Sequence, residues 1–287
     1  MIVTDLTEET TAMTPIDTTA GRIRADHALT VENLTKDFGD KHVLGGLDLA
    51  VQPGEFVCIV GPSGAGKTTL LRCLSGLMSP TAGTVTYGAQ AVDRPLSEIA
   101  VVFQDYRGSL MPWMRVWDNV AFPLQSRGVR KEERRARAVR ALESVGLGDD
   151  ADLYPWQLSG GMQQRVAIAR ALAYDSPILL MDEPFGSVDA QTRFELEDLI
   201  RQLRADLGLT IALVTHDIDE AVYLSDRVVV VAGKPTRVID AIEIDLGAER
   251  DQIGTKASRR FGELRSRVMR EIIDPRYRGD GEELTDV

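Results

Sequence analysis

Four short runs of consecutive apolar residues stand out along the chain. They occupy residues 56–60, 178–181, 210–214 and 228–231. Runs without polar alternation are typical of strands buried on both faces, as in a parallel sheet covered by helices. Helical patterns lie between the runs, and this alternation predicts an α/β fold with right-handed crossovers.

Two helical patterns flank these runs. "KTTLLRCLSGL" follows the first run directly, and "QTRFELEDLIRQLRADLG" precedes the third. The spacing of the second pattern predicts a helix that ends at Gly208 and places its apolar side chains near one face. These side chains belong to Phe194, Leu196, Leu199, Ile200 and Leu203.

The interval between residues 105 and 174 has a different pattern. Two strong helical segments, "VRKEERRARAVRALESVGL" and "SGGMQQRVAIARALAY", have no convincing strand between them, which predicts an inserted, all-helical subdomain. Residues 27–51 and 83–87 instead alternate Thr and Val between glycine turns. They predict a small antiparallel sheet that leans on the core.

Composition narrows the class of protein. With 287 residues, of which 44% are hydrophobic, the chain can bury a sizeable core. The formal net charge of -11 argues against nucleic acid as a partner, because such binding neutralises phosphates with Lys and Arg. Cys58 and Cys73 are too few and too scattered for a disulfide framework or a zinc site, so buried thiols are expected.

The ends of the chain predict a cytoplasmic protein. Residues 1–27 are rich in Thr, Asp and Glu, lack the pattern of a signal peptide, and are expected to form a disordered tail. No stretch approaches the ~18 apolar residues of a membrane helix. Any role at a membrane would therefore need a partner that spans it.

The stretch "GPSGAGKT" fits the phosphate-binding loop pattern G-x-x-x-x-G-K-[ST]. It follows an apolar strand and opens a helix, which is the context the motif requires. Backbone N–H groups of the loop and the helix N-terminus are expected to hold phosphates, with Lys67 on the β- and γ-phosphates and Thr68 on Mg²⁺. The predicted ATP-binding residues here are Gly61, Pro62, Ser63, Gly64, Ala65, Gly66, Lys67, Thr68 and Thr69.

Two carboxylates end the next core run, in "ILLMDEP". Asp182 suits the Mg²⁺ shell, directly or through water. Glu183 is then free to orient the attacking water and accept its proton, a role worth roughly 10²–10⁴ in rate. Without a phosphate-binding loop, an ordinary surface Asp-Glu pair would be the better interpretation.

Two more polar residues follow predicted core strands. His216 comes after "TIALVT", at the edge where α/β proteins bind ligands, and could contact the γ-phosphate and fix the water with Glu183. Gln104 comes after "IAVVF" and could offer its amide oxygen to Mg²⁺ or to the water. Taken alone, each could simply be a polar residue that caps a strand.

The motifs occur in the order phosphate-binding loop, Gln104, "LSGGMQQR", "LLMDEP", "SVD" and His216. This set closely resembles the ATPase subunits of ATP-binding-cassette (ABC) transporters, over roughly residues 28–240. The resemblance implies a P-loop NTPase core with a mainly parallel sheet, a small antiparallel β subdomain, and a helical subdomain at about residues 105–175. The remaining residues, 241–287, are expected to form a C-terminal helix, near residues 259–273, and a polar tail.

The resemblance also gives "LSGG" a role. It implies that Ser159, Gly160 and Gly161 bind the γ-phosphate of an ATP held by a second chain, so that two chains enclose two ATPs. The second chain would be another copy or a close relative. By the same resemblance, Phe38 stacks on adenine, although it could be a core aromatic, and Asp189 lies in a loop that crosses the dimer interface.

The segment "SLMPWMRVWDNVAFPL" has two interpretations. Its large apolar side chains could be core, or they could form a groove for a helix of a membrane permease, as the resemblance implies. "MPWMRVWDNVAFPLQSRG" and "MDEPFGSVDAQTR" resemble ATPases of nitrate, sulfonate and taurine importers, which work with a solute-binding protein and lie on the inner face of the membrane. The alternatives are a soluble non-transport ABC ATPase, another P-loop enzyme such as a nucleotide kinase, and a cassette that binds ATP without hydrolysing it.

Overall fold

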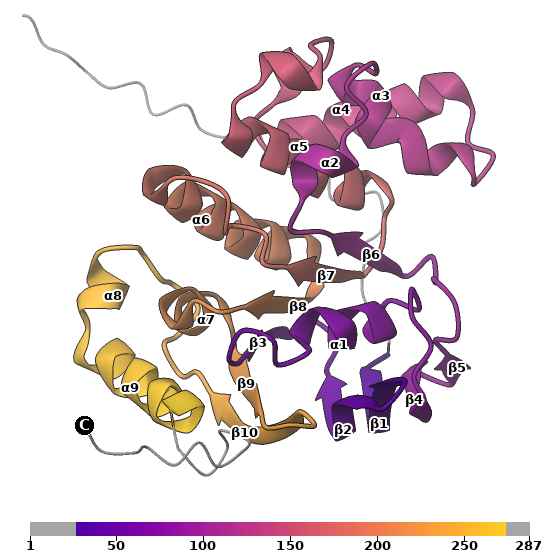
Figure 1. Cartoon of the computed structure of the whole chain (residues 1–287). Helices are drawn as coiled ribbons and strands as arrows, with labels where there is room; N and C mark the ends of the chain where they lie inside the picture. Colours follow the sequence, from indigo (N-terminus) through magenta and orange to yellow (C-terminus); the bar gives the residue numbers. More distant parts are fainter. Residues whose placement is uncertain (1–26, 274–287) are drawn as a thin grey trace, which may run out of the picture.

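A six-stranded sheet forms the centre of the molecule (Figure 1). The computed structural model describes residues 27–273. The strand order is β10-β9-β3-β8-β7-β6, and all neighbours are parallel except β10 and β9. The strands are β3 (Phe56–Val60), β6 (Ile99–Val102), β7 (Ile178–Asp182), β8 (Thr210–Thr215), β9 (Arg227–Ala232) and β10 (Arg237–Glu243). The four apolar runs are therefore strands of one sheet, and all five residues of β3 and of β7 are buried, as predicted.

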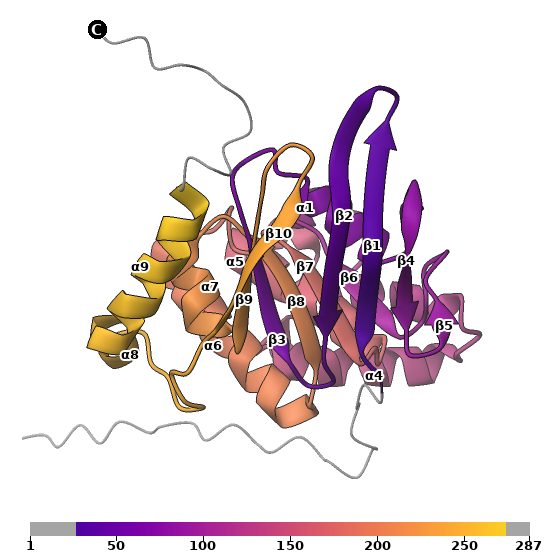
Figure 2. The same cartoon turned by 90° about the horizontal axis from the view of Figure 1, so that it is seen from below.

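A smaller antiparallel sheet lies beside the first (Figure 2). Its order is β2-β1-β4-β5, from β1 (Leu29–Phe38), β2 (Lys41–Val51), β4 (Ala82–Tyr87) and β5 (Gln90–Ala91). Helix α1 (Lys67–Leu74) packs its Leu70, Leu71 and Leu74 into one core with buried residues of both sheets. The small antiparallel sheet predicted from Thr/Val alternation is thus confirmed.

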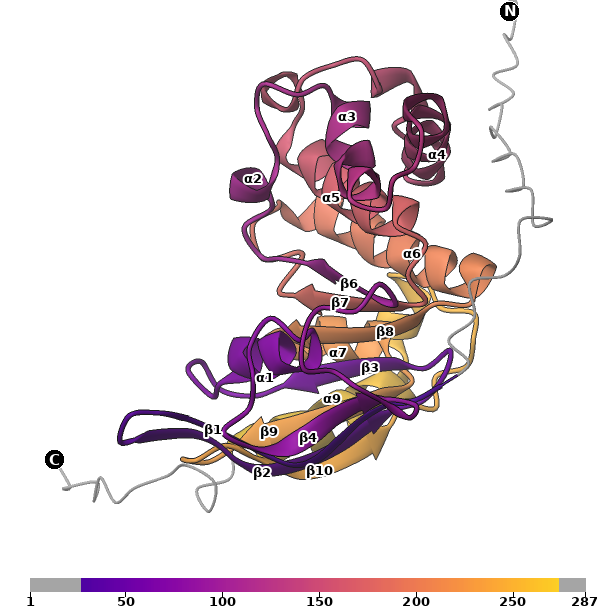
Figure 3. The ribbon, with the colours of Figure 1, turned by 90° about the vertical axis from the view of Figure 1, so that its right-hand side faces the viewer.

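Helices and turns, with no strand, form the lobe above β6 (Figure 3). The four α-helices are α2 (Tyr106–Ser109), α3 (Val116–Ala121), α4 (Lys131–Ser144) and α5 (Gly160–Ala173). Three 3₁₀ turns link them: η1 (Phe122–Gln125), η2 (Gly148–Asp150) and η3 (Pro155–Gln157). The arginine-rich α4 is largely solvated, with Arg137 bound to Glu133 at 2.6 Å.

The segment "SLMPWMRVWDNVAFPL" divides between core and surface. Val116 and Trp117 are buried, whereas Trp113 is 73% exposed. The core interpretation is therefore confirmed for Val116 and Trp117, and docking at the exposed Trp113 stays a prediction.

The helices of the C-terminal part of the chain pack on the other side of the sheet from the antiparallel strands (Figure 2). Helix α9 (Arg259–Ile273) spans the range expected for it and inserts Phe261, Leu264 and Val268 into the core beside α7 (Ile218–Leu224). The short α8 (Gly254–Ala257) precedes it. The expected domain boundary at residue 240 falls inside β10. The C-terminal helix α9 belongs to the main hydrophobic core and is not a separate unit.

Helix α6 (Ala190–Leu207) ends at Gly208, as predicted, but one side chain on its apolar face was placed wrongly. Leu196, Ile200 and Leu203 are buried, whereas Phe194 is 42% exposed. The Nζ of Lys256 lies 4.6 Å from the centroid of the Phe194 ring, so a cation rather than the core contacts it.

Two further expectations concern single features. Cys58 and Cys73 are free, buried thiols, as predicted. Among the described residues no helix is long and apolar enough to span a bilayer. The expected tail at residues 1–27 lies, apart from His27, outside the described residues.

Candidate functional site

The phosphate-binding loop joins β3 to α1 and depends on the absence of side chains at its glycines. A β-carbon at Gly61 would lie 2.2 Å from the carbonyl oxygen of Val231 on the neighbouring strand β9. Gly66, the N-cap of α1, has φ +71°. Because an L side chain rarely adopts that backbone conformation, the turn into α1 needs glycine there.

Lys67 is buried in this loop. Its Nζ donates hydrogen bonds to the carbonyl oxygens of Gly61 (2.8 Å) and Pro62 (3.0 Å). Burial lowers the pKa of Lys67, and the nearby carboxylates of Glu183 and Asp182 oppose that change. The loop thus holds a buried cation close to two carboxylates.

Asp182 ends β7 directly opposite the loop. The Oγ1 of Thr68 donates to Asp182 Oδ1 at 3.3 Å, and the carboxylate is 5% exposed. Burial raises the pKa of Asp182. A buried carboxylate beside a hydroxyl is an oxygen donor set that suits a hard cation such as Mg²⁺, although no group of three or more His, Cys, Asp or Glu in the described chain could hold a metal by itself.

Glu183 brings two other segments together. Its Oε2 accepts a hydrogen bond from Gln104 Nε2 at 3.2 Å and lies 3.1 Å from His216 Nδ1. The backbone N–H of Glu183 donates to Val214 O at 2.8 Å, and its φ is +43°. Such a conformation costs about 1–3 kcal/mol and persists only where its surroundings fix it, as they do at this strand end.

The structure therefore brings Gln104, Asp182, Glu183 and His216 to the edge of the sheet that carries Lys67 and Thr68. The amide nitrogen of Gln104 donates to Glu183, and the expected contact of its amide oxygen with a metal or water stays a prediction.

Ser159, Gly160 and Gly161 of the "LSGG" stretch, called the signature from here on, lie elsewhere, in the helical lobe. Ser159 is the exposed N-cap of α5 and accepts a hydrogen bond from Met162 N at 3.3 Å, while Gly160 begins the helix. A β-carbon at Gly161 would lie 2.3 Å from Thr192 Cγ2 of α6. In Figure 1, α5 and α1 occupy different parts of the molecule, on opposite sides of β6. Within the described residues no hydrogen bond joins this stretch to the phosphate-binding loop.

Phe38 and Asp189 also have defined surroundings. Phe38 ends β1, is 47% exposed and has Lys36 Nζ at 5.2 Å from its ring centroid, so it is no core aromatic. Asp189 is the N-cap of α6: its Oδ1 accepts from Thr192 N at 3.0 Å and its Oδ2 from Thr192 Oγ1 at 2.7 Å.

Sequence reasoning missed Asp217, the residue after His216. Asp217 Oδ1 accepts from the backbone N–H groups of Asp219 and Glu220 and so caps α7. Its Oδ2 binds Arg193 Nη1 at 3.1 Å. The Asp-x-x-Glu spacing is a helix-start signal, but no pattern in the sequence indicates that α6 and α7 meet there.

Glu220 is a buried acid near the site, 4% exposed. Burial first, and then the carboxylates of Glu197 and Asp217, raise the pKa of Glu220 to about 8, while a hydrogen bond from Thr215 opposes the change. Glu220 is therefore mainly neutral at pH 7.

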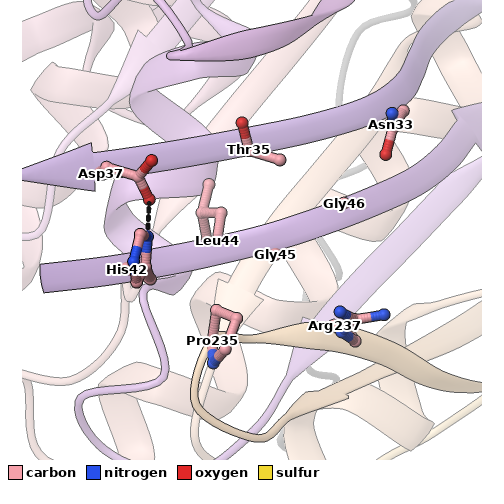
Figure 4. A pocket seen from close by; sticks show the side chains of 9 residues that line it. All are labelled: Asn33, Thr35, Asp37, His42, Leu44, Gly45, Gly46, Pro235 and Arg237. Carbon is pink, nitrogen blue, oxygen red and sulfur yellow. Dashed lines mark hydrogen bonds and ion pairs between the residues drawn. The ribbon is translucent and has the colours of Figure 1, made fainter.

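A separate open pocket of about 370 Å³ lies on the antiparallel sheet (Figure 4). Its walls come from β1, β2 and the turn between β9 and β10, where Pro235 faces the consecutive glycines Gly45 and Gly46. None of the residues predicted to handle ATP lines it. The convergence of charged groups at the sheet edge, rather than this hollow, identifies the candidate site.

The chain is similar to several known proteins. Residues 44–186 match the family model described as ABC transporter. The chain is 42% identical over 245 residues to the aliphatic sulfonates import ATP-binding protein SsuB of Pseudomonas putida, covering 85% of this chain and 86% of that protein. It is 47% identical over 199 residues to the taurine import ATP-binding protein TauB of Chromobacterium violaceum, covering 69% and 76%.

A solved structure is similar as well. A dimeric ATP-binding cassette in a post-hydrolysis state, bound to ADP and Pi, matches with a TM-score of 0.66 and 34% identity. The match covers 75% of this chain and 98% of that one. It agrees with the fold class predicted from the sequence.

The raised pKa of Glu220 predicts a specific pH dependence of stability. Between about pH 4.5 and pH 8 the unfolded chain has lost the Glu220 proton while the folded chain keeps it, so the free energy of unfolding falls as pH rises. Glu220→Gln removes this loss. Its stability relative to the unmodified chain should improve by on the order of 2–4 kcal/mol between pH 5 and pH 8 in urea unfolding.

Glu32→Gln, on an exposed strand position, is the matched control and should show no such trend. Identical pH profiles for Glu220→Gln and the unmodified chain would mean that Glu220 is ionised in the folded state.

Proposed function

The chain belongs to the ATP-binding proteins of the ABC transporter family, which are ATPases, and we propose that it powers uptake of a small organic sulfonate through separate permease subunits. The observation that carries this proposal is that Gln104, Glu183 and His216 meet beside the phosphate-binding loop. The signature stretch lies apart from this loop, at the start of α5. This division of parts suits an ATPase whose site is completed by a second chain.

In this proposal the loop residues from Gly61 to Thr69 bind the ATP phosphates, and Phe38 stacks on adenine. The exposed Phe38 ring supports the latter role, because a buried ring would be unavailable. Thr68 and Asp182 hold Mg²⁺, with Gln104 close by. The metal neutralises charge on the β- and γ-phosphates when it is bound.

Glu183 acts as the general base in this mechanism. Its carboxylate accepts a proton from the attacking water. His216 contacts the γ-phosphate and helps to fix this water, and Gln104 holds the Glu183 carboxylate by a hydrogen bond. Lys67, now bonded to loop carbonyls, turns to the phosphates when nucleotide binds. The positive N-terminus of α1 adds to their stabilisation.

The second half of the site comes from another copy or a close relative of the chain. The γ-phosphate of the partner's ATP accepts hydrogen bonds at the N-terminus of α5, from Ser159, Gly160 and Gly161. Asp189 lies at the dimer interface. The exposure of Ser159 and the dimeric state of the related cassette support this arrangement.

The permease subunits dock on the helical lobe in this proposal. We assign residues 28–240 to the ATPase domain, with residues 105–175 as the helical subdomain that receives the permease. Trp113 is 73% exposed whereas Trp117 is buried, and this exposure supports a docking role for Trp113. The chain would then sit on the cytoplasmic face of the membrane, with a solute-binding protein on the other side. The names of the sulfonate and taurine import relatives support the choice of solute.

Glu183→Gln tests the catalytic part of the proposal. The amide cannot accept the water proton, so steady-state ATP hydrolysis should fall by roughly 10²–10⁴-fold while ATP still binds. In size-exclusion chromatography with ATP the variant should accumulate as a dimer. Glu249→Gln, at an exposed position, should hydrolyse ATP normally. A monomer at saturating ATP would refute the shared site.

Trp113→Ala tests the docking part. Removing this exposed ring should reduce recovery of the complex with the permease subunits, because exposed aromatic anchors carry much of the binding energy of an interface. ATP binding should stay unchanged. Ile253→Ala is the control, because Ile253 is also exposed (83%) but lies away from the helical lobe, next to α8. Undiminished complex recovery for Trp113→Ala would contradict the docking assignment.

A further inference from the structure

We infer that the first turn of α6 mechanically links the signature of this chain to its own His216, and that Arg193 is the positioning residue at the end of the link. The inference rests on the proposed function, in which the signature contacts the partner's ATP and His216 serves the chain's own ATP. It predicts that each site is adjusted by the occupancy of the other through contacts inside one chain.

The signature end of the link is a close contact between two helices. A β-carbon at Gly161 would come within 2.3 Å of Thr192 Cγ2, so glycine allows the start of α5 to lie directly on the Thr192 methyl group. Little free space remains between the two helix starts. Any shift of Gly161 toward or away from a phosphate must therefore be accommodated by Thr192.

The Thr192 side chain is itself fixed from its other side. Its hydroxyl donates to Asp189 Oδ2 at 2.7 Å, and its backbone N–H donates to Asp189 Oδ1 at 3.0 Å. The next N–H, that of Arg193, donates to the carbonyl oxygen of Asp189 at 2.9 Å. Together these bonds make residues 189–193 one rigid turn that carries Thr192 and Arg193 on different faces.

Arg193 then reaches the segment after β8. Its Nη1 binds Asp217 Oδ2 at 3.1 Å. The Asp217 side chain is also held by the N–H groups of Asp219 and Glu220, and its own N–H donates to Thr215 Oγ1 at 3.0 Å. Since His216 lies between Thr215 and Asp217 in the chain, these contacts fix the backbone that aims its ring at Glu183.

Several carboxylates surround Arg193, so the contact with Asp217 requires a positively charged side chain at position 193. Glu197 and Asp217 both raise the pKa of Glu220, and Lys256 pairs with Glu197 at 3.1 Å. Arg193 lowers the pKa of Glu220 and pairs directly with Asp217. Its Nε has no hydrogen-bond partner within the described part of the chain, and the paired side chains are 30% and 33% exposed. A partly solvated pair of this kind is weak enough to open and close.

The test uses Arg193→Met, Asp217→Asn and the double variant in the full chain with ATP and Mg²⁺. Asn still caps α7, so Asp217→Asn removes the charge and keeps the helix start. Each single variant should lower kcat by about 10–100-fold, since small misplacement of a catalytic group costs up to that much. KM for ATP and Tm should stay unchanged. Arg193→Lys, which keeps the cation, should restore part of kcat.

Two comparisons separate positioning from a general structural role. Arg204→Met removes the Arg204–Asp226 ion pair, which lies on the same helix with similar exposure, and should leave kcat unchanged. The double variant should be no slower than the slower single variant, because both changes break one contact.

Unchanged kcat in Arg193→Met, or independent, multiplying losses in the double variant, would overturn the inference. An equal loss of kcat in Arg204→Met would overturn it as well. These results are distinct from failure of the proposed function, which would show as an unmodified chain that hydrolyses no ATP or a Glu183→Gln variant that never dimerises.

Discussion

Parallel pairing of neighbouring strands is the constraint on which the site depends. In register, Val60 of β3 lies beside Thr215 of β8, Val214 beside Asp182 of β7, and Met181 beside Val102 of β6. Because parallel strands all end at the same edge, the segments that follow them meet there. The phosphate-binding loop, the two carboxylates, His216 and Gln104 are those segments, although more than 150 residues separate the first from the last.

This constraint explains why so much was predictable. A run of apolar residues predicts a strand, and the polar residue after the run is then expected at the carboxyl edge of the sheet. The order of the motifs along the chain indicates the family. The sequence predicted the two sheets, the helical lobe, helices α6 and α9, and the residues that now surround Glu183.

Features that depend on packing between distant helices were not predictable. Phe194 has an apolar side chain at a helical spacing that suits the core, yet it is 42% exposed and its ring contacts Lys256 near α8. Strand β10 was not predicted from the sequence, and only Ile242 is buried along it. The Arg193–Asp217 pair joins two helix starts that no local pattern brings together.

The central claim is that a complete site needs the phosphate-binding loop of one chain and the signature of another. The most direct test mixes two inactive variants, Lys67→Ala, which keeps its signature, and Ser159→Arg, which keeps its loop and Glu183. In a mixed dimer one site combines the intact loop with the intact signature, so ATP hydrolysis should reappear well above the sum of the two variants measured alone. A mixture no more active than that sum would contradict the account.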